Sequence, residues 1–273
     1  MSRILATALP EFRIALRNRW VAIALVMMAV FSLVLGLAGS SPTGDLGVDR
    51  LSVTVASLTS LSVYLIPLLA LLISFDAIAG ETERGTLPLL LTYPVARHQI
   101  LLGKFLAHLA VLALAVLAGY GLTAAIALGK DGGALAGLPA LWRLGWSSVL
   151  LGATFLGAGY AISALARRSS AAAGLAIGLW LGAVVLYDLA LLAAVVADHG
   201  GWFTTDAFPV ALLANPADAF RLFNLSASGA QGAASGVGGA AMAIPPWQSL
   251  LSVLIWPVIA LTLAGAAFRK VTP

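Results

Sequence analysis

Long apolar runs separated by short polar stretches extend along the whole chain, and the lengths of those runs decide the class of fold. A helix needs about 20 mostly apolar residues to cross the hydrocarbon core of a bilayer. We expect membrane spans near residues 20–39, 57–79, 101–128, 146–166, 171–197 and 249–268. The pattern therefore predicts an all-α integral membrane protein, a single transmembrane domain over residues 1–273 with six transmembrane helices.

Residues 3–19 have a different pattern from the runs that follow them. Apolar residues recur there at helical spacing along one narrow stripe: Leu5, Leu9, Phe12, Leu16 and Trp20. Basic residues lie off that stripe: Arg3, Arg13 and Arg17. An amphipathic helix of this kind lies in the membrane interface, with its basic side chains among anionic headgroups. We therefore expect an N-terminal interfacial helix, and the alternative is a plain start to the first span.

Composition supports the same fold class and excludes others. Of the 273 residues, 61% are hydrophobic and only 10% are charged, whereas about a quarter of the residues of a soluble domain are charged. The excess of 15 basic over 11 acidic residues is small, and in a membrane protein such an excess sets topology rather than binding nucleic acid. The chain has no cysteine, so neither disulfides nor thiolate metal sites are available to it.

The basic residues also predict the orientation of the six spans. An even number of spans puts both termini on one side of the membrane. With residues 80–100 and 167–170 on that same side, it carries eleven basic residues: Arg3, Arg13, Arg17, Arg19, Arg84, Arg97, Lys104, Arg167, Arg168, Arg269 and Lys270. The other side carries four: Arg50, Lys130, Arg143 and Arg221. Basic residues concentrate on the cytoplasmic side, so we expect both termini in the cytoplasm.

The stretch 198–248 is the largest extracytoplasmic loop of this topology. Its second half is rich in Gly, Ala and Ser, which is typical of a flexible linker. Its first half carries residues that could fold locally or contact a periplasmic protein partner: Trp202, Phe208, Asn215, Asp218, Phe220 and Arg221. Anchoring of the aromatic residues at the membrane interface is an equally good interpretation.

The connector between the second and third spans, residues 80–99, is a charged and turn-rich stretch between two apolar runs. Gly85 can end the preceding helix, and Thr86 is suited to cap a new one. The new helix would present apolar residues from its first position onward: Leu87, Leu89 and Leu90. Such a short helix, held along the membrane surface, fits a groove on a soluble protein.

Four charged residues surround this short helix: Glu81, Glu83, Arg84 and Arg97. They could contact the rim of such a groove while the leucines insert, or they could brace the connector internally. The alternative to docking is a solvated loop whose charges only prevent insertion into the membrane. Lys104 begins the third span, and we expect its side chain to snorkel to the interface.

In its overall plan, and most specifically between Glu81 and Lys104, the chain resembles the ABC-2 type permeases. The matching residues are Glu81, Glu83, Arg84, Gly85, Thr86, Leu87, Pro94, Arg97, Gly103 and Lys104. Pro88 departs from the family pattern, in which an acidic residue is frequent there. The resemblance implies a type V exporter-like permease in which residues 3–19 form the elbow helix and residues 80–99 the coupling segment that docks on an ATPase.

The partners follow from the same resemblance. A cytoplasmic ABC ATPase subunit would bind ATP and Mg, because this chain has no Gly-x-x-x-x-Gly-Lys-[Ser/Thr] phosphate loop. We therefore expect no catalytic residue, no metal and no cofactor in the chain itself. Two permease copies and two ATPase subunits would form the complete exporter, embedded in lipid in the inner (cytoplasmic) membrane of a bacterium.

A narrower likeness concerns the overall chain plan and residues 215–222. In both, the chain resembles the permease subunits of ABC complexes that help to mature the copper sites of periplasmic nitrous oxide reductase. The soft ligands that copper prefers are Cys, Met and His, and here they form no cluster in the sequence. The resemblance therefore implies export of another substrate, or mechanical transmission to a periplasmic partner.

Polar residues within the apolar runs are further candidates for function. Asp188, beside Tyr187, lies in the fifth span, and His108 lies in the third. A carboxylate inside a membrane is costly to bury without a partner, so Asp188 could line a pathway, with Tyr187 or His108 as hydrogen-bond partner. A structural role for Asp188 is an equally good interpretation, and His108 fits a packed, hydrogen-bonded histidine better than a ligand.

Three glycines lie four residues apart on one face of the fifth span: Gly174, Gly178 and Gly182. Small residues at this spacing permit close approach of another helix, so they could form the seam between two copies or pack within one. Two other function classes remain open. An ion-gradient-driven secondary transporter would show inverted repeats, and an intramembrane enzyme would need a convergent catalytic set.

Overall fold

The computed structural model describes residues 3–38, 50–92, 95–130, 137–226 and 244–271, and within these ranges the chain is helical without a strand. In chain order the helices are α1 (Arg3–Leu16), α2 (Arg19–Ala38), α3 (Arg50–Ser74), α4 (Ala79–Glu83), α5 (Leu87–Thr92), α6 (Arg97–Lys130), α7 (Leu138–Leu165), α8 (Ser169–Trp180), η1 (Leu181–Leu186), α9 (Tyr187–Asp198), η2 (Phe203–Ala207), α10 (Phe208–Ala214), α11 (Pro216–Leu225) and α13 (Pro246–Arg269).

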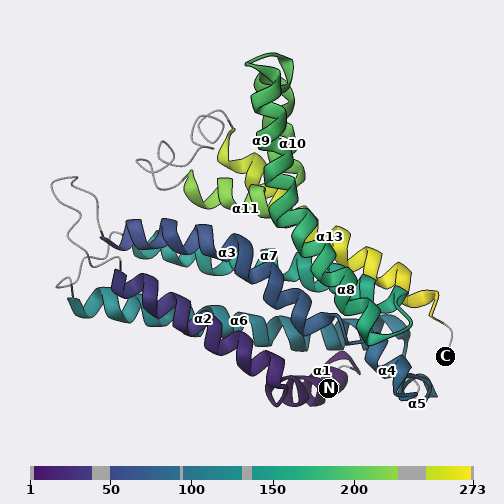
Figure 1. The fold of residues 1–273 in the computed structure, drawn as a ribbon. Coiled ribbons are helices and arrows are strands. Elements are labelled where there is room, and N and C mark those ends of the chain that lie inside the picture. The colour runs from purple at the N-terminus through teal and green to yellow at the C-terminus, as the bar shows by residue number, and fades with distance from the viewer. Residues whose placement is uncertain (1–2, 39–49, 93–94, 131–136, 227–243, 272–273) are drawn as a thin grey trace.

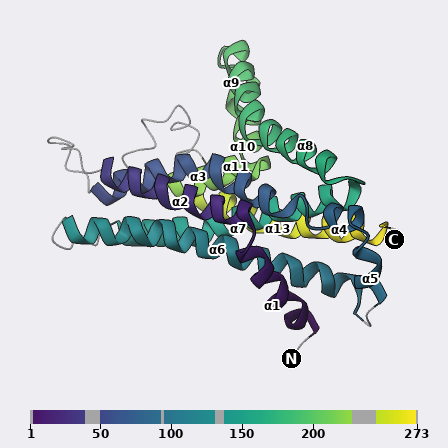
Figure 2. The same cartoon turned by 60° about the horizontal axis from the view of Figure 1, so that its bottom comes forward.

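Five helical segments are long and apolar enough to cross a membrane: Thr54–Glu83, Arg97–Ile126, Leu138–Leu165, Ser169–Asp198 and Pro246–Arg269. A further apolar helix, α2, follows α1 at an angle of 71°, and Figures 1 and 2 show α1 set across the start of α6. The prediction of an all-α membrane fold is confirmed. The second expected span comprises α3 and α4, with a turn over residues 75–78 between them.

Helix α7 is the centre of the bundle, and it packs against α3, α6 and α13. Glycines on α7 permit this close packing. A Cβ atom added at Gly157 would lie 2.8 Å from the Cβ of Ala260 on α13 and 2.9 Å from its backbone carbonyl carbon. Backbones approach each other this closely in membrane helices only where the side chains between them are small. Tyr160 and Leu156 lie one turn apart on α7 and are fully buried.

The fifth span, formed by α8, η1 and α9, differs from the others in how little of it the chain covers. Only 11% of its apolar window is buried, against 61% for each of the three spans that precede it. In Figures 1 and 2 it leaves the bundle from α8 onward, and α9 projects away from the other helices. A Cβ atom added at Gly174, Gly178 or Gly182 would meet no described atom within 4 Å. The glycine face is thus not used for packing against the described part of this chain.

The predicted extracytoplasmic loop begins with helices. After the turn at Gly200, η2 and α10 return toward the bundle, and α11 then packs on α3, α7 and α13. The Gly/Ala/Ser-rich segment predicted as a linker falls largely within residues 227–243, outside the described residues.

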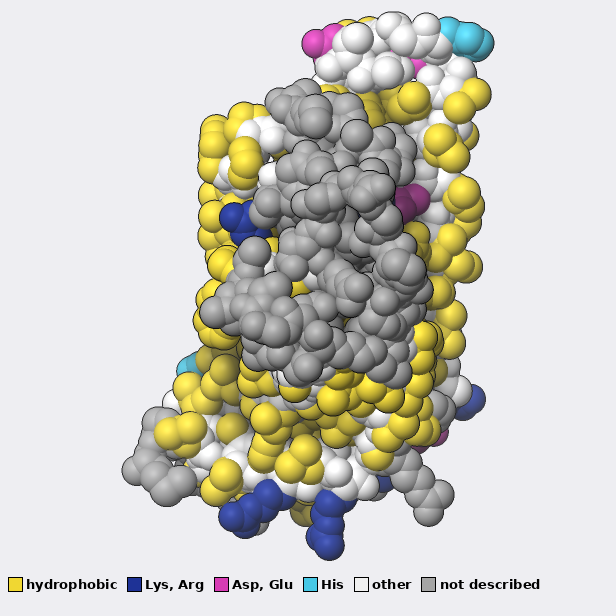
Figure 3. Space-filling view, turned by 90° about the vertical axis from the view of Figure 1, so that its left-hand side faces the viewer, with side chains coloured by type: hydrophobic (Ala, Val, Ile, Leu, Met, Phe, Trp, Pro, Cys, Tyr) yellow, Lys and Arg dark blue, Asp and Glu magenta, His cyan; other side chains and the backbone are white. Residues whose placement is uncertain are grey.

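Large apolar side chains are exposed on the spans, among them Val26, Leu114 and Leu254, which agrees with a lipid environment around the bundle. Figure 3 looks onto the left-hand end of the bundle in Figure 1. Outside the grey area it shows many hydrophobic side chains, with Lys and Arg side chains gathered at the bottom, where α1 lies, and acidic and histidine side chains at the top, at the end of α9. In Figures 1 and 2, α4, α5 and the C-terminus lie at one end of the bundle. We call this the connector end.

We predict that Gly157→Leu destabilises the bundle by about 1–3 kcal/mol, because the new side chain must displace α13. The measurement is the thermal unfolding midpoint of the purified protein in detergent. Gly121→Leu is the matched control, since a Cβ atom at Gly121 meets nothing within 4 Å, and its midpoint should remain within a degree or two of wild type. Equal midpoints for the two variants would contradict the packing described here.

Candidate functional site

The coupling segment forms two short helices joined by a tight turn. Helix α4 ends at Glu83, and Gly85 takes the left-handed conformation, with φ of 68°, that a glycine adopts without strain. Helix α5 then begins at Leu87, where the sequence predicted it. The Thr86 hydroxyl does not cap α5 but donates to the carbonyl of Glu81 at 3.2 Å. The turn therefore ties α4 to the start of α5.

The leucines of α5 divide between the inside and the outside of the molecule. Leu87 is 1% exposed, and Leu90 is half-buried against the core. Leu89 is 66% exposed. It lies at the connector end, among the charged residues of the segment. An exposed leucine at this position is suited to insertion into a groove on another protein.

The charged residues of the segment brace it against neighbouring helices. Arg84 pairs with Asp76 at 3.3 Å. Glu83 accepts a hydrogen bond from the backbone N–H of Ser169, at the start of α8, at 3.0 Å. The Ser169 hydroxyl also bonds the Asp76 carboxylate. These contacts hold the connector to the first turn of the fifth span.

Arg97 connects the other end of the segment to the last span. Its Nη1 atom donates to three backbone carbonyls at the end of α13: Phe268 at 3.2 Å, Arg269 at 3.1 Å and Val271 at 2.6 Å. The last carbonyls of a helix have no intrahelical partner, and a cation there complements the helix dipole. Of the two roles open to the charged residues, the structure shows internal bracing.

Lys104 is the most buried charge at the connector end, and the prediction that it snorkels to the interface is wrong. The residue is 5% exposed, and its Nζ atom lies 2.7 Å from Glu11 Oε1 on α1 and 2.6 Å from Glu81 Oε1 on α4. Two carboxylates offset the cost of removing the ammonium group from water. Gly103 makes this possible, because a Cβ atom there would lie 2.0 Å from the Thr7 hydroxyl.

His108 lies one turn further along α6 and belongs to the same region. Its Nδ1 atom is 2.6 Å from the Tyr160 hydroxyl, and the two rings stack with centroids 5.8 Å apart. The structure thus pairs His108 with α7 and not with Asp188. Among the described residues no three His, Cys, Asp or Glu side chains gather to hold a metal ion.

Asp188 is paired with Arg221, which the sequence assigned to a different group of candidates. Arg221 Nη2 lies 2.8 Å from Asp188 Oδ2, and its Nη1 lies 3.0 Å from Asp218 Oδ1. The guanidinium group thereby joins the fifth span to α11. A cavity of about 230 Å³ adjoins the pair and is lined by Asp188, Leu191, Leu192, Val195, Phe208, Leu212 and Arg221. Tyr187 instead donates its hydroxyl to the carbonyl of Ala211 at 2.8 Å.

Asp218 is the unusual member of this group. It is 1% exposed, and its Oδ2 atom has no hydrogen-bond donor among the described residues. Burial, and after it the charge of Asp188, raises the pKa of Asp218 to about 7, although Arg221 opposes the shift.

Asn215 fastens α11 to the fifth span at a second point. Segment η1 is a π-helix, in which the hydrogen bonds skip one residue further than in an α-helix. Asn215 Nδ2 donates to the carbonyl of Ala183 in this segment at 2.6 Å, and its Oδ1 accepts from the N–H of Ala217 at 2.8 Å. Asn215 therefore caps the N-terminus of α11 and connects this helix to η1. The Asn–Pro pair at 215–216 is the N-cap signal in the sequence from which this start of α11 can be predicted.

The structure distributes the six candidates for a periplasmic contact between surface and interior. Trp202 is 71% exposed. Phe208 is half-buried in a small core with Leu191, Leu212 and Leu222. Asn215, Asp218 and Phe220 are buried within this chain, and Arg221 is occupied by its two carboxylates. Trp202, beside the turn that follows α9, is the member of the set best placed to meet another protein.

We predict that Lys104→Met lowers stability by about 3–5 kcal/mol, because it leaves two buried carboxylates unpaired. The triple variant with Glu11→Gln and Glu81→Gln should recover much of this loss, since no buried charge then remains at the site. Thermal midpoints in detergent measure both effects. If the triple variant were no more stable than Lys104→Met alone, the shared ion pair would be contradicted.

We predict a pH dependence of stability that originates at Asp218. Its pKa of about 7 lies above its ordinary value of 3.8, so the folded chain binds this proton more tightly than the unfolded chain. The resulting stabilisation is present at acid pH and is lost as pH rises from about 4 to about 7. The thermal midpoint should fall over that window in wild type and should fall less in Asp218→Asn, whose amide resembles the protonated acid. An identical fall in both would show that another group titrates.

Comparison with known proteins shows the family to which the chain belongs. A family model described as ABC-2 family transporter protein matches residues 5–271. The chain is 44% identical to the "Probable ABC transporter permease protein NosY" of Stutzerimonas stutzeri over 99% of both chains. It is 45% identical to the protein of the same name from Pseudomonas aeruginosa strain PAO1 over 95% of both chains. The chain belongs to the ABC-2 family of transporter proteins and is a multi-pass membrane permease similar to NosY.

Proposed function

We propose that this chain is the membrane-spanning subunit of an ABC transporter whose ATP and Mg are bound by a separate cytoplasmic ATPase subunit. Membership of the permease family supports the first part. The absence of a phosphate-loop sequence from the chain supports the second. The ATPase docks at the coupling segment, with Leu89 inserted into its surface.

The observation that carries this proposal is the bracing of the coupling segment. Glu81 joins it through Lys104 to α1 and α6, Glu83 joins it to α8, and Arg97 joins α6 to α13. A force applied to α5 is thereby distributed to the first helix and to three spans. Closure of an ATPase dimer would move these helices together, which is the kind of rigid-body rearrangement that drives exporters.

The proposed orientation places the connector end in the cytoplasm of a bacterium and the chain in its inner membrane. The eleven basic residues expected on that side include Arg84, Arg97, Arg269 and Lys270, and α5 and the C-terminus lie together in both ribbon views. The opposite end, with α11 and the turn after α9, then faces the periplasm, and both termini are cytoplasmic.

We propose that two copies pair through the fifth span. Its apolar window is only 11% buried in one chain, and Gly174, Gly178 and Gly182 present an uncovered face. A second copy would cover this face with close backbone contact. Asp188, which is paired with Arg221 of α11, would lie on the same span, toward its periplasmic half.

We further propose a role in copper-site maturation of nitrous oxide reductase, on the basis of the similarity to NosY. Because the chain has no cysteine and only four methionines, copper lacks the soft ligands it prefers along this path. The function is therefore export of another substrate or mechanical transmission to a periplasmic protein. The exposed Trp202 is the residue through which such a partner would be engaged.

We predict that Leu89→Asp abolishes co-purification with the ABC ATPase subunit of this transporter, because the charge cannot enter an apolar groove. Leu89→Met is the matched control and should retain the complex, since it keeps the apolar volume. Arg97→Ala should bind the ATPase but lose most ATP-driven function, because the brace to α13 is gone. Retention of the complex by Leu89→Asp would place the docking surface elsewhere.

A further inference from the structure

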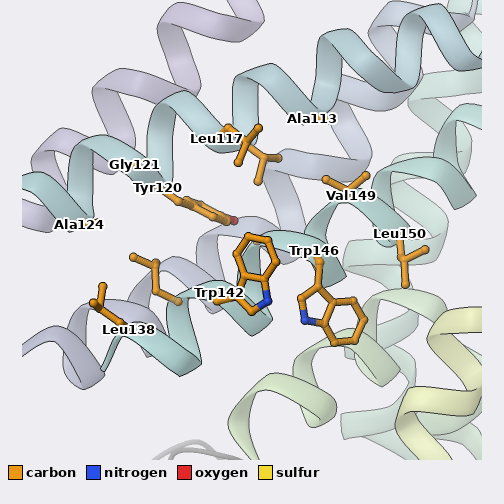
Figure 4. A pocket seen from close by; sticks show the side chains of 13 residues that line it. Ala113, Leu117, Tyr120, Gly121, Ala124, Leu138, Trp142, Trp146, Val149 and Leu150 are labelled. Carbon is orange, nitrogen blue, oxygen red and sulfur yellow. The ribbon is translucent and has the colours of Figure 1, made fainter. Parts of the chain in front are cut away.

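A groove runs between α6 and α7 on the outside of the bundle, in the half of the membrane away from the connector end. Its volume is about 650 Å³, within the range of roughly 300–1,000 Å³ typical of small-molecule sites. Figure 4 shows its walls, and the residues that the argument uses are Leu117, Tyr120, Gly121, Leu138, Trp142 and Trp146. The fifth span and its ion pairs are not part of it.

The groove exists because two glycines leave room for it. Gly121 on α6 has no described atom within 4 Å of a Cβ position, and Gly145 on α7 has only the edge of Tyr120 at 4.0 Å. Larger side chains at these positions would fill the hollow. The gap is therefore specified by the sequence and is not a by-product of poor packing.

The walls offer apolar surface and almost no polar atoms. The one hydroxyl among the lining side chains, that of Tyr120, is engaged with the core: it lies 2.5 Å from the Ser62 hydroxyl and 3.0 Å from that of Ser148. Tyr120 therefore contributes the apolar surface of its ring to the wall of the groove. The indole N–H groups of Trp142 and Trp146 are the hydrogen-bond donors that remain among the lining side chains, so a polar or charged cargo would lose more hydration here than it regains in hydrogen bonds.

The groove opens outward and at membrane depth. Both helices are candidate spans, and Trp142 and Leu117 on the two walls are 70% and 59% exposed. Trp142 lies in the first turns of α7, where tryptophans gather at the level of lipid headgroups. Figure 4 shows its indole ring beside that of Trp146. Hydrocarbon is therefore the medium that reaches this opening.

We propose that the groove between α6 and α7 binds one acyl chain of a membrane phospholipid from the leaflet opposite the connector end, with Trp142 and Trp146 at headgroup level. The bound chain packs against the ring of Tyr120. It thereby supports the hydroxyl cluster that links α3, α6 and α7 through Ser62, Tyr120 and Ser148. This binding goes beyond the proposed transport function and does not depend on the ATPase.

The test is lipid retention by the purified protein. Wild-type protein is exchanged into brominated phosphatidylcholine, diluted into lipid-free detergent and washed, and both bound phosphorus and tryptophan fluorescence are measured. We expect close to one phospholipid per chain, with tryptophan fluorescence quenched by the bromine atoms. Gly121→Phe, which fills the groove, should lose most of the retained lipid and of the quenching.

Two further variants make the result decisive. Leu263→Phe places the same side chain on the exposed face of α13, outside the groove and the fifth span, and should retain the lipid. The double variant Trp142→Phe, Trp146→Phe should lose most of the quenching per retained phospholipid, because the indoles beside the bound lipid are gone. Equal lipid retention by wild type and Gly121→Phe would overturn the proposal. If Gly121→Phe instead abolished pairing of two copies at unchanged lipid content, the groove would belong to that interface and the proposal would fail.

Discussion

A charge inside a lipid-embedded bundle has to find its counter-charge in the protein, and this constraint organises both ends of the molecule. At the connector end, Lys104 is shared by Glu11 and Glu81, which brings α1 and α4 onto α6. At the opposite end, Arg221 is shared by Asp188 and Asp218, which brings α11 onto the fifth span. In each case one basic side chain and two carboxylates join elements far apart in the sequence, because leaving any of the three unpaired is costly.

The fifth span is bonded to other elements at its start and again around residues 183–188. Ser169, at its start, is bonded to Glu83 and Asp76 of the connector. Further along, Asn215 holds the π-helical segment at Ala183, and Arg221 holds Asp188. The span is also held at Trp180, whose indole N–H donates to the carbonyl of Tyr64 on α3 at 2.9 Å. Displacement of the connector could therefore reach α11 through the fifth span. A second route is α3, which precedes α4 and packs directly on α11.

The sequence predicted the features that depend on local pattern. The apolar runs gave the helical membrane fold, and Gly85 followed by Leu87 marked the start of α5. Pairings across long separations were beyond such reasoning. The residues near Lys104 in the sequence do not indicate that Glu11, 93 residues away, contacts it. A lysine at the start of an apolar run therefore predicts a side chain that snorkels to the membrane interface. One role of Asn215 could be predicted from the sequence, because an Asn–Pro pair signals a helix start. Its hydrogen bond to the carbonyl of Ala183 could not.

Glycine shows most clearly why a pattern needs a structure to interpret it. Gly157 and Gly178 both lie in apolar helices where small residues permit close contact, yet Gly157 faces the backbone of α13 and Gly178 faces no described atom. Gly121 is a third case, since its missing side chain opens a groove. A small residue in a span therefore specifies only that space is left, and the neighbouring elements decide what occupies it. Within this chain that occupant is a helix at Gly157. At the other two positions no described part of the chain supplies it, and we propose a second copy at Gly178 and lipid at Gly121.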